Sequence, residues 1–471
     1  MELTSDWMRY LREPCAVLGL ARSNLPLIDF LLEQGVPKVT ARDRLDSESM
    51  QKVASALRSK GVDCRLGENY LDGLTERVIF RTPAIRPDLP ILREAEARGA
   101  LITSEMELFL ELTPATVIGV TGSDGKTTTT TLIGRFLEAE CEKKGHGRVF
   151  VGGNIGVPLL PRLSEMTADD FAVVELSSFQ LMSMKRSVHR AALTNLSPNH
   201  LDWHRDMAEY GEAKTNLFRH SQCQMLVTNG ENPAALALSR EASAPITLFS
   251  SAHAPEELSP HRGNTVFLRD GVICVKNGDT VEEILSAEEI LLPGRHNLEN
   301  YMTAIGVTRG LVSVERIREV AGAFRGVAHR LELIRELNGV RYYNSSIDSS
   351  PTRTAAALSA LSETEGGIVV ICGGYDKKLS YAPLAEALNR HASAVVLTGA
   401  SADDIALALT DSKSSLKIVR KPLFADAVEA AKQLAKFGDR VVLSPACASF
   451  DAFRDFEERG NTFRAIVESF T

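Results

Sequence analysis

Short apolar runs alternate with longer amphipathic segments along most of the chain. At the start, residues 15–20 (CAVLGL) predict a buried strand, a helical pattern follows as far as Leu32, and Gly35 is expected to end that helix. A second strand near Val39 ends at Asp43, which completes a β-α-β opening typical of a Rossmann-like domain. The same patterns predict two more strands and then a short helix with a linker, at 78–80, 101–103 and 104–114.

A second group of elements begins at residues 117–131, VIGVTGSDGKTTTTT. The first part is an apolar strand, glycines provide a tight turn, and the threonine run opens a helix. Asp270-Gly271 separates the apolar runs VFLR and VICV and predicts a β-hairpin. The other elements expected in this part are strands at 149–151, at 171–175 and before Thr194, and helices at 210–218 and from Asn297.

A third group of elements follows residue 327. Asn338-Gly339 lies between LELIREL and VRYYN and predicts a second hairpin. Strands that alternate with helices are then expected at 367–372, 394–398, 416–419 and 441–443. This alternation predicts a small parallel α/β domain. We therefore expect an α/β protein whose three domains span residues 1–110, 111–326 and 327–471.

Composition narrows the class of protein. A chain of 471 residues is too long for one hydrophobic core, and two to four domains are expected. The net charge of −8 argues against a nucleic-acid partner bound by a broad basic face. The seven cysteines are scattered without a C-x-x-C pair, which suits reduced thiols in the cytoplasm rather than disulfides or a zinc site. The sequence shows no secretory signal and no apolar run of about 18 residues, so we expect no membrane span.

The glycine-rich turn in 117–131 has the chemistry of a phosphate-binding loop. Its backbone amides, the N-terminus of the following helix and the Lys126 ammonium all favour an anion, and Thr127 is a natural hydroxyl ligand for Mg²⁺. The match to a Walker A motif is imperfect because Val120 stands where a glycine is expected. The alternative is a strand-to-helix turn that binds nothing.

Other polar residues follow predicted strands. Glu175 ends a buried strand, where a P-loop enzyme places a Mg²⁺ partner. His200 stands close to Asp202 and His204, so we expect it to ligate a metal or orient a carboxylate, and a structural histidine is the alternative. Lys214 looks, from its pattern alone, like an exposed helical lysine.

Several positions have weaker patterns. Asn297 and Asn300 share one helix face and could contact a purine, although solvated asparagines are the commoner finding. Asp43 and Thr82 lie at the ends of strands, where open α/β sheets bind ligands, and a solvated carboxylate is the alternative for Asp43. The segment GLARSN keeps only the first glycine of a dinucleotide fingerprint, which disfavours an oxidoreductase.

Five motifs together resemble the Mur ligases of peptidoglycan synthesis. They are TGSDGKTTTT, ELSSFQL, GRHNLEN, AHRLE and LSPACASFDAFRDFEERGN. ELSSFQL and the last motif are most similar to the branch that joins D-glutamate to UDP-N-acetylmuramoyl-L-alanine. The resemblance covers nearly the whole chain. It implies a Rossmann-like N-terminal domain for the UDP-substrate, a central P-loop-type α/β ATPase domain, and a C-terminal Rossmann-like α/β domain for the amino acid.

The resemblance also implies roles for individual residues. ATP would be bound at the phosphate loop, with Lys126, His200 and Lys214 as the catalytic residues, and Mg²⁺, in two sites, would complete the centre. Lys214 matches a lysine that relatives carry as a carbamate. The implied ATP-binding residues are Gly122, Ser123, Asp124, Gly125, Lys126, Thr127, Thr128, Asn297, Asn300 and Arg330. The implied substrate-binding residues are Ser23, Asp43, Thr82, Asn154, Lys377, Ser449, Phe450 and Phe456, and the implied metal-binding residues are Thr127, Glu175, His200 and Lys214.

The sequence departs from the family pattern in three places, one of which is Tyr375, where relatives can carry an aspartate, so the choice between Lys377 and Lys378 stays open. Ser123-Asp124 replaces the usual Thr-Asn, so the Asp124 carboxylate should point away from phosphates or pair with a cation. Ser345 and Ile347 replace an aspartate and a lysine of many relatives, and Asp348 or the 376–378 cluster is a candidate substitute.

Two other functions stay open. The chain could be a neighbouring Mur ligase that adds a different amino acid, or a P-loop ATPase or kinase with no ligase step.

Overall fold

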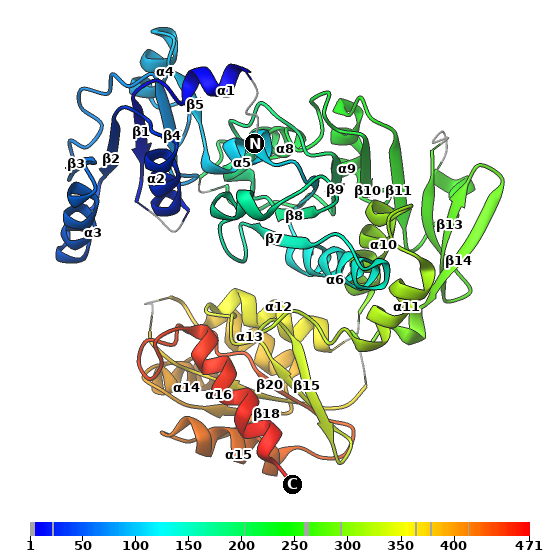
Figure 1. Cartoon of the computed structure of the whole chain (residues 1–471). Coiled ribbons are helices and arrows are strands. Elements are labelled where there is room, and N and C mark those ends of the chain that lie inside the picture. Colours follow the sequence, from blue (N-terminus) through cyan, green and yellow to red (C-terminus); the bar gives the residue numbers. More distant parts are fainter. Residues whose placement is uncertain are drawn as a thin grey trace. The chain divides into compact units, whose positions relative to one another are not determined.

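The computed structural model has a mixed α/β fold (Figure 1). It describes residues 5–20, 23–201, 203–258, 263–292, 294–362, 365–376, 379–412 and 414–471. The strands of these ranges form three sheets, of five, nine and six strands. The chain divides into two compact units, Met1–Ala287 with Glu299–Val320 and Glu288–Leu298 with Ala321–Thr471. Among the described helices, none has the length and apolar character that a membrane span requires.

The first sheet is parallel, with strand order β3-β2-β1-β4-β5. All four residues of β1 are buried, as its apolar run predicts, and Gly35 adopts φ 74° just beyond helix α2. Its strands are β1 (Cys15–Leu18), β2 (Val39–Asp43), β3 (Asp63–Leu66), β4 (Val78–Arg81) and β5 (Leu101–Thr103). The helices of this part are α1 (Ser5–Tyr10), α2 (Asn24–Glu33), α3 (Glu48–Ser59) and α4 (Pro90–Ala97).

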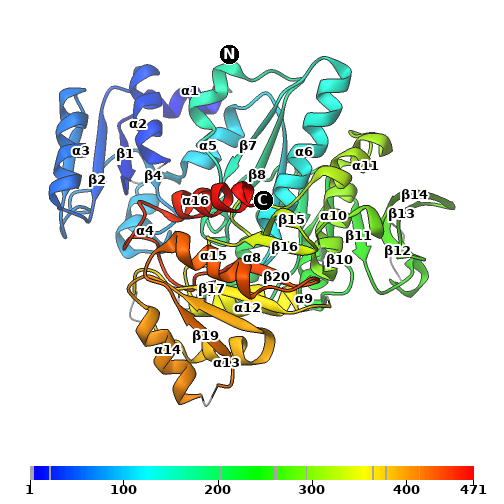
Figure 2. The same ribbon diagram turned by 90° about the horizontal axis from the view of Figure 1, so that it is seen from below.

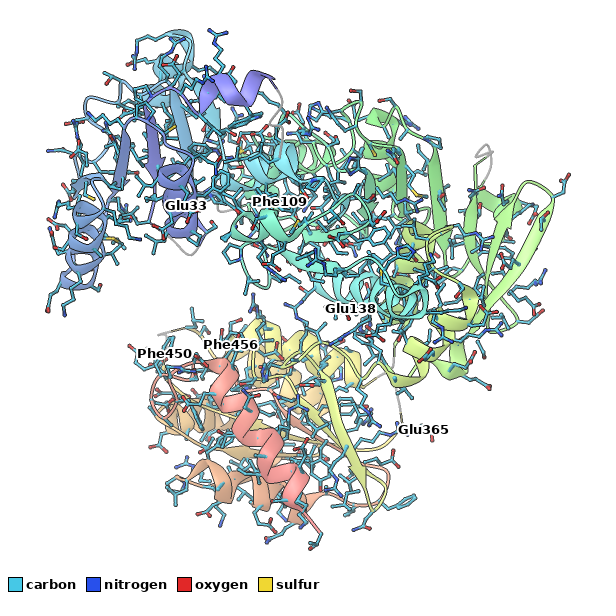
Figure 3. The ribbon with its side chains drawn as sticks, in the orientation of Figure 1. Glu33, Phe109, Glu138, Glu365, Phe450 and Phe456 are labelled. Atoms are coloured by element: carbon cyan, nitrogen blue, oxygen red, sulfur yellow. The ribbon has the colours of Figure 1, made fainter. Side chains whose placement is uncertain are left out.

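Helix α5 (Glu105–Leu112) leads from the first sheet to the central sheet. Its first turn is capped by the Ser104 hydroxyl, which accepts a hydrogen bond from the Glu107 amide. Phe109 on this helix (labelled in Figure 3) is fully buried in one hydrophobic core with residues of both sheets. The predicted boundary between residues 110 and 111 therefore falls inside a buried helix.

The central sheet has the order β14-β13-β12-β11-β10-β9-β6-β8-β7. The predicted hairpin at Asp270-Gly271 is confirmed by antiparallel pairing of β12 with β13. Its strands are β6 (Thr116–Thr121), β7 (Val149–Gly153), β8 (Phe171–Glu175), β9 (Arg190–Leu193), β10 (Met225–Asn229), β11 (Ile246–Ser250), β12 (Thr265–Arg269), β13 (Val272–Asn277) and β14 (Thr280–Ser286). The α-helices here are α6 (Lys126–Lys144), α7 (Ser178–Leu181), α8 (Met207–Thr215), α9 (Pro233–Leu238), α10 (Arg295–Thr308) and α11 (Val314–Ala323).

Helix α8 begins earlier than its sequence pattern predicts. The prediction of a helix over 210–218 is wrong at both ends because α8 spans Met207–Thr215. The Asp206 side chain accepts a hydrogen bond from the Glu209 amide and so starts the helix before the apolar pattern begins.

The third sheet has the order β15-β16-β20-β17-β18-β19, and its hairpin at Asn338-Gly339 is confirmed. Helices α15 and α16 cover one face, and α12, α13 and α14 cover the other (Figure 2). The strands are β15 (Glu332–Leu337), β16 (Val340–Asn344), β17 (Ile368–Cys372), β18 (Ala394–Leu397), β19 (Lys417–Arg420) and β20 (Arg440–Leu443). The helices are α12 (Pro351–Leu361), α13 (Ala382–His391), α14 (Ala402–Asp411), α15 (Phe424–Leu434) and α16 (Phe456–Ser469).

Candidate active site

The loop between β6 and α6 requires its glycines. Gly122 and Gly125 have φ values of 147° and 78°, which favour glycine. A Cβ on Gly122 would collide with the Thr194 hydroxyl, and one on Gly125 would collide with the Asn300 side chain. The loop therefore lies close to its neighbours and delivers the chain to the N-terminus of α6, whose first N–H groups have no partners within the helix.

Three residues of the predicted site meet at the ends of adjacent strands. The Thr127 hydroxyl donates to Glu175 Oε2 over 2.7 Å, and Asn154 Nδ2 donates to Glu175 Oε1 over 2.8 Å. The pairings Val120↔Glu175 and Gly153↔Glu175 bring the ends of β6 and β7 to the end of β8. Glu175 is only 2% exposed, so its carboxylate is held in one orientation by two donors.

Two lysines share one acceptor on the phosphate loop. Lys126 Nζ donates to the carbonyls of Gly122 and Ser123 over 3.1 and 2.9 Å, and Lys214 Nζ donates to the same Gly122 carbonyl over 2.8 Å. Lys214 is 1% exposed and lies over the Tyr210 ring, with Nζ 4.5 Å from its centroid. Burial, and then the charge of Lys126, hold the pKa of Lys214 well below its usual value. The interpretation of Lys214 as an exposed lysine, made from its pattern alone, is wrong because α8 turns this side chain toward the loop.

The histidines of the central segment have different environments. His200 is exposed, has φ 53°, and packs edge-on against Phe179 with 4.9 Å between ring centroids. His204 is buried, its Nε2 lies 2.9 Å from the Ser178 hydroxyl, and burial lowers its pKa. Asp202 lies outside the described residues. Within the described ranges, no group of three or more His, Cys, Asp or Glu residues gathers as a metal would require.

The Ser123 and Asp124 side chains turn toward the loop after β9. The Ser123 hydroxyl donates to the Ser197 carbonyl over 2.9 Å and lies 3.0 Å from the Tyr210 hydroxyl. Asp124 is exposed, and its carboxylate accepts a bond from the Ser197 hydroxyl over 3.4 Å. The Thr194 hydroxyl donates to the Asp124 carbonyl over 2.6 Å, a contact that sequence reasoning missed. Thr128 is half-buried in the first turn of α6.

The predicted nucleotide residues outside the loop have separate environments. Asn300 is buried, and its Oδ1 accepts a hydrogen bond from Thr129 over 3.2 Å beside Gly125, so it does not lie on the surface as solvated asparagines do. Asn297 is half-buried in the first turn of α10. Arg330 is exposed and lies between His329 and Leu331, which both have positive φ.

Residues predicted on the first sheet surround the loop after β1. Asp43 accepts hydrogen bonds from the backbone amides of Leu20 and Leu45, over 2.6 and 2.8 Å. Thr82 donates its amide to the Leu18 carbonyl over 2.9 Å. Ser23 occupies the N-cap position of α2, where its side chain makes no capping bond. The three residues therefore lie at one edge of the sheet, where its strands end.

Ser345 and Ile347, which depart from the family pattern, lie just after β16. The Ser345 hydroxyl is buried and accepts a hydrogen bond from the Leu331 amide over 3.1 Å. Asp348 is also buried, accepts a bond from the Ser444 hydroxyl over 2.9 Å, and has a pKa raised by that burial. Asp348 thus contributes a carboxyl group to the same strand end as Ser345. Ile347 is half-buried there.

The segment after β20 carries the predicted amino-acid site. Ser449 is buried, whereas Phe450 is 65% exposed and lies edge-on to Tyr375 at 6.2 Å. Phe450 and Phe456 lie at the same end of this part of the molecule (Figure 3). Lys377 lies outside the described residues.

Sequence reasoning missed Arg459 in α16. Its buried guanidinium donates to the Ser346 hydroxyl over 3.0 Å and to the carbonyls of Ser346, Cys447 and Ala448. Arg459 lies in the motif FEERGN, but nothing in the sequence distinguishes this buried arginine from one on the surface.

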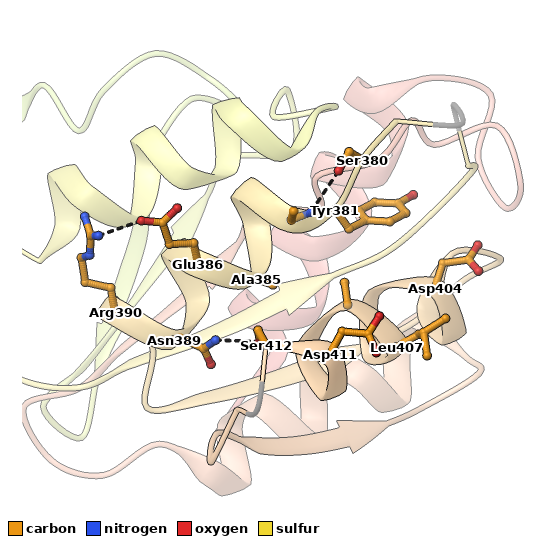
Figure 4. A pocket seen from close by; sticks show the side chains of 12 residues that line it. Ser380, Tyr381, Ala385, Glu386, Asn389, Arg390, Asp404, Leu407, Asp411 and Ser412 are labelled. Carbon is orange, nitrogen blue, oxygen red and sulfur yellow. Dashed lines mark hydrogen bonds and ion pairs between the residues drawn. The ribbon is translucent and has the colours of Figure 1, made fainter.

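A pocket of about 820 Å³ lies between α13 and α14 (Figure 4). Tyr381 lines it, and the hydroxyl of Tyr381 donates to Asp376 over 3.1 Å. Of the predicted site residues that the structure describes, none lines this pocket.

The chain matches two family models. A model described as Mur ligase middle domain matches residues 120–308, and one described as Mur ligase, glutamate ligase domain, matches residues 329–447. The chain is 44% identical over 460 residues to the UDP-N-acetylmuramoylalanine–D-glutamate ligase of Clostridium novyi, with 96% of each chain covered. It is 42% identical over 462 residues to the ligase of the same name from Ruminiclostridium cellulolyticum, again with 96% of each chain covered.

Solved structures share the fold. The UDP-N-acetylmuramate–alanine ligase of Thermotoga maritima matches with a TM-score of 0.52 and 17% identity, over 97% of this chain and 99% of that one. A UDP-N-acetylmuramoyl-L-alanyl-D-glutamate–2,6-diaminopimelate ligase matches with a TM-score of 0.56 and 16% identity, over 97% of this chain and 92% of that one. At these identities the likeness is one of fold.

Proposed function

This chain belongs to the Mur ligase family, among its UDP-N-acetylmuramoylalanine–D-glutamate ligases, and from that membership we propose which residues carry out the reaction. The protein is an ATP-dependent ligase that joins D-glutamate to UDP-N-acetylmuramoyl-L-alanine in peptidoglycan precursor synthesis. The observation that carries this function is the 44% identity to such a ligase over 96% of both chains.

The chemistry requires an activated carboxylate, because a carboxylate is a poor acyl donor. The terminal phosphoryl group of ATP passes to the alanine carboxylate, which gives an acyl phosphate and ADP. The D-glutamate amine then attacks the acyl carbon; a C–N bond forms, the C–O bond to phosphate breaks, and the amine loses a proton. The protein must therefore hold two anions together and neutralise their charge.

The loop at 122–125 and the start of α6 form the ATP phosphate site in this proposal. Lys126 Nζ, which bonds to two loop carbonyls, would exchange these acceptors for phosphate oxygens. The amides of the loop and the first turn, including Thr127 and Thr128, supply donors. The amides of Ser123 and Asp124 donate to the Asn195 carbonyl and to Asn195 Oδ1, over 3.0 and 2.9 Å, so these two residues would hold the loop in shape around the phosphates.

The donor set at the strand ends fits Mg²⁺. Thr127 and Glu175 offer a hydroxyl and a carboxylate 2.7 Å apart, and oxygen ligands of this kind suit a hard cation. These two residues would hold one ion, which would neutralise phosphate charge. His200 and Lys214 would complete a second site.

Lys214 can serve that second site only as an anion. Its lowered pKa keeps more of the amine neutral, and a neutral amine adds to CO₂ to form a carbamate and release a proton. The carbamate would lie beside the Lys126 charge. A ¹³C NMR signal from labelled bicarbonate, present in the native protein and in Lys143→Ala but absent in Lys214→Ala, tests this modification without an activity assay.

The remaining roles follow the position of each residue in the family pattern. The UDP-substrate would contact Ser23, Asp43, Thr82 and Asn154. D-Glutamate would contact Lys377, Ser449, Phe450 and Phe456. Asn297 would lie near the adenine of ATP and Arg330 near its phosphates, while Asn300 would support the phosphate loop beside Gly125 and Thr129. The three domains 1–110, 111–326 and 327–471 would divide UDP-substrate, ATP and amino-acid binding in that order.

We also propose that the enzyme works in the cytoplasm. All seven cysteines are free thiols, as suits a reducing compartment.

ADP release in the presence of UDP-N-acetylmuramoyl-L-alanine and a panel of L- and D-amino acids tests the function. We expect release that depends on both D-glutamate and the UDP-substrate. Dependence on another amino acid would indicate a neighbouring ligase, and release without either co-substrate would indicate an ATPase.

A further inference from the structure

Arg86 leaves the first sheet next to a residue of the proposed UDP-substrate site. After β4 the chain turns at Thr82, where the Ile85 amide donates to the Thr82 carbonyl over 3.1 Å. Arg86 follows this turn, and its side chain extends to the central part of the same compact unit. Arg86 is therefore four residues from Thr82 in sequence, yet it contacts the segment that precedes α8.

Every N–H group of the Arg86 guanidinium has a partner. It donates to both carboxylate oxygens of Asp88, over 2.8 and 2.9 Å, and to both of Glu209, over 2.8 and 3.2 Å. It also donates to the Trp203 carbonyl over 2.7 Å and lies over the Trp203 ring, 4.8 Å from its centroid. Two bidentate carboxylates balance the charge of the guanidinium, and together with the stacked ring they hold it in one orientation. We name these four residues the Arg86 bridge.

The far end of the bridge is Glu209, close to the start of α8. Glu209 lies in the first turn of α8 and also accepts hydrogen bonds from the amide and side chain of Arg205. The hydrogen bonds from Arg86 are the largest cause that lowers the Glu209 pKa to about 2, so this carboxylate stays ionised. His204 Nδ1 lies 3.5 Å from Glu209 Oε2. Helix α8 carries Lys214, and the segment before it carries His200.

A second arginine, the last residue of β4, makes a similar connection. Arg81 at the end of β4 is buried and donates to the Ser183 hydroxyl over 2.6 and 3.1 Å and to the Phe179 carbonyl over 3.2 Å. These residues belong to α7 and the chain just after it, which follow Glu175. The two arginines therefore attach both ends of the Thr82 turn to the segments that surround the phosphate site.

We propose that Arg86 is a positioning residue that fixes the start of α8, and with it His200 and Lys214, relative to the Thr82 turn. The proposal rests on the proposed function, because it assigns Thr82 to the UDP-substrate and Lys214 to the reacting phosphate. Binding of the UDP-substrate at the Thr82 turn would then affect the position of α8 through the fully hydrogen-bonded Arg86 guanidinium. Arg86 itself would contact no reacting atom.

Four variants test the bridge: Arg86→Gln, Arg86→Lys, Glu209→Gln and the double variant Arg86→Gln/Glu209→Gln. The matched control is Arg269→Gln, which breaks an exposed pair between Arg269 of β12 and Glu283 of β14. We expect Arg86→Gln to lower kcat by about tenfold or more, because small displacements of positioned groups are costly. The KM values for ATP and D-glutamate should change by less than roughly twofold. Arg86→Lys should be intermediate, since an ammonium cannot make two bidentate contacts.

The double variant shows whether Arg86 and Glu209 act through their shared contact or whether each substitution lowers kcat independently. Since Arg86 and Glu209 act together, the double variant should be no slower than the worse single variant. The proposal would be overturned if the kcat loss of the double variant equalled the product of the two single losses. It would also be overturned if folded Arg86→Gln had the same kcat as Arg269→Gln.

Hydrogen exchange gives a readout that does not need activity. In Arg86→Gln we expect faster amide exchange over residues 203–215 and unchanged exchange in β10. If the native protein shows no D-glutamate-dependent ADP release, the proposed function fails; unchanged exchange over 203–215 would instead overturn the bridge alone.

Discussion

Lys126 is the residue on which the phosphate site depends most directly. Its ammonium group bonds to two loop carbonyls and follows Gly125 at the start of α6, where phosphates would bind. We predict that Lys126→Ala lowers ATP turnover by about 10²–10³-fold, the usual loss when a donor to developing charge is removed.

ADP release under saturating co-substrates measures the effect of Lys126→Ala. Lys143→Ala, an exposed position in the last turn of the same helix, is the control and should leave turnover unchanged. Near-native ADP release in Lys126→Ala would remove this lysine from the phosphate site.

Glu105 is a buried carboxyl group whose stability effect has a clear sign. Burial raises its pKa from 4.5 to about 7, and its Oε1 has no hydrogen-bond partner. Between these pH values the folded protein retains a proton that the unfolded chain has lost, so stability falls as pH rises through this window. The full cost at higher pH is on the order of 3 kcal/mol.

We predict that Glu105→Gln is more stable than the native protein at pH 8.5 and that the difference disappears below pH 4.5. Thermal melts across this range measure it, with Glu94→Gln, an exposed position in α4, as the control. A constant difference at every pH would show that the carboxyl group does not titrate as its burial requires.

At the residue scale, the sequence predicted which side chains belong to the site better than it predicted how those side chains are buried and bonded. Thr127, Glu175 and Asn154 come from three separate segments and are joined by hydrogen bonds. All three were identified from their places near predicted strand ends or from their match to the family pattern. Lys214 shows the limit: its helix has too weak an apolar pattern to tell which face is buried, so pattern alone placed it in solvent. Arg459 was missed because its partners are backbone carbonyls, which any sequence supplies.

At the element scale, the phosphate loop is supported by α10. Asn300 on α10 contacts Gly125 and accepts a hydrogen bond from Thr129, so its amide is used inside the protein. We predict that Asn300→Ala raises the KM for ATP by roughly tenfold, equivalent to about 1.4 kcal/mol. Because the amide supports the loop rather than a base, the preference for ATP over GTP should not change.

Kinetics with ATP and GTP in parallel measure that preference, and Asn297→Ala on the first turn of α10 is the comparison. A selective loss of ATP, with GTP use unaffected, would restore the direct adenine contact that the family pattern implies for Asn300.

Regular elements were the most predictable part of the fold. The two hairpins were found from Asp-Gly and Asn-Gly because these residues adopt the positive φ values that tight turns need. Strand β3 was not predicted, since its alternating exposed and half-buried residues carry no apolar signal. The start of α8 was misplaced because a single capping contact of Asp206, and not hydrophobicity, sets it.

At the scale of the whole molecule, the distribution of hydrophobic cores differs from the three predicted domains. One core contains Val17, Phe80 and Phe109 together with Phe150 and Leu163, so the first and central sheets share buried surface. The third sheet has its own cores on both faces. Periodicity identifies separate sheets, but it cannot show which sheets share a core, because that depends on contacts between distant segments.

This distribution predicts which fragments fold alone. The fragment 321–471 contains both cores of the third sheet, and we expect it to melt cooperatively and to lack ATP turnover because the phosphate loop is elsewhere. The fragment 1–110 ends inside α5 and exposes the core it shares with the central sheet, so we expect no cooperative transition. Circular dichroism melts and dispersed amide NMR spectra distinguish the two outcomes. Cooperative melting of 1–110 would show that the first domain is independent, and its contacts through Arg81 and Arg86 would then be dispensable for folding.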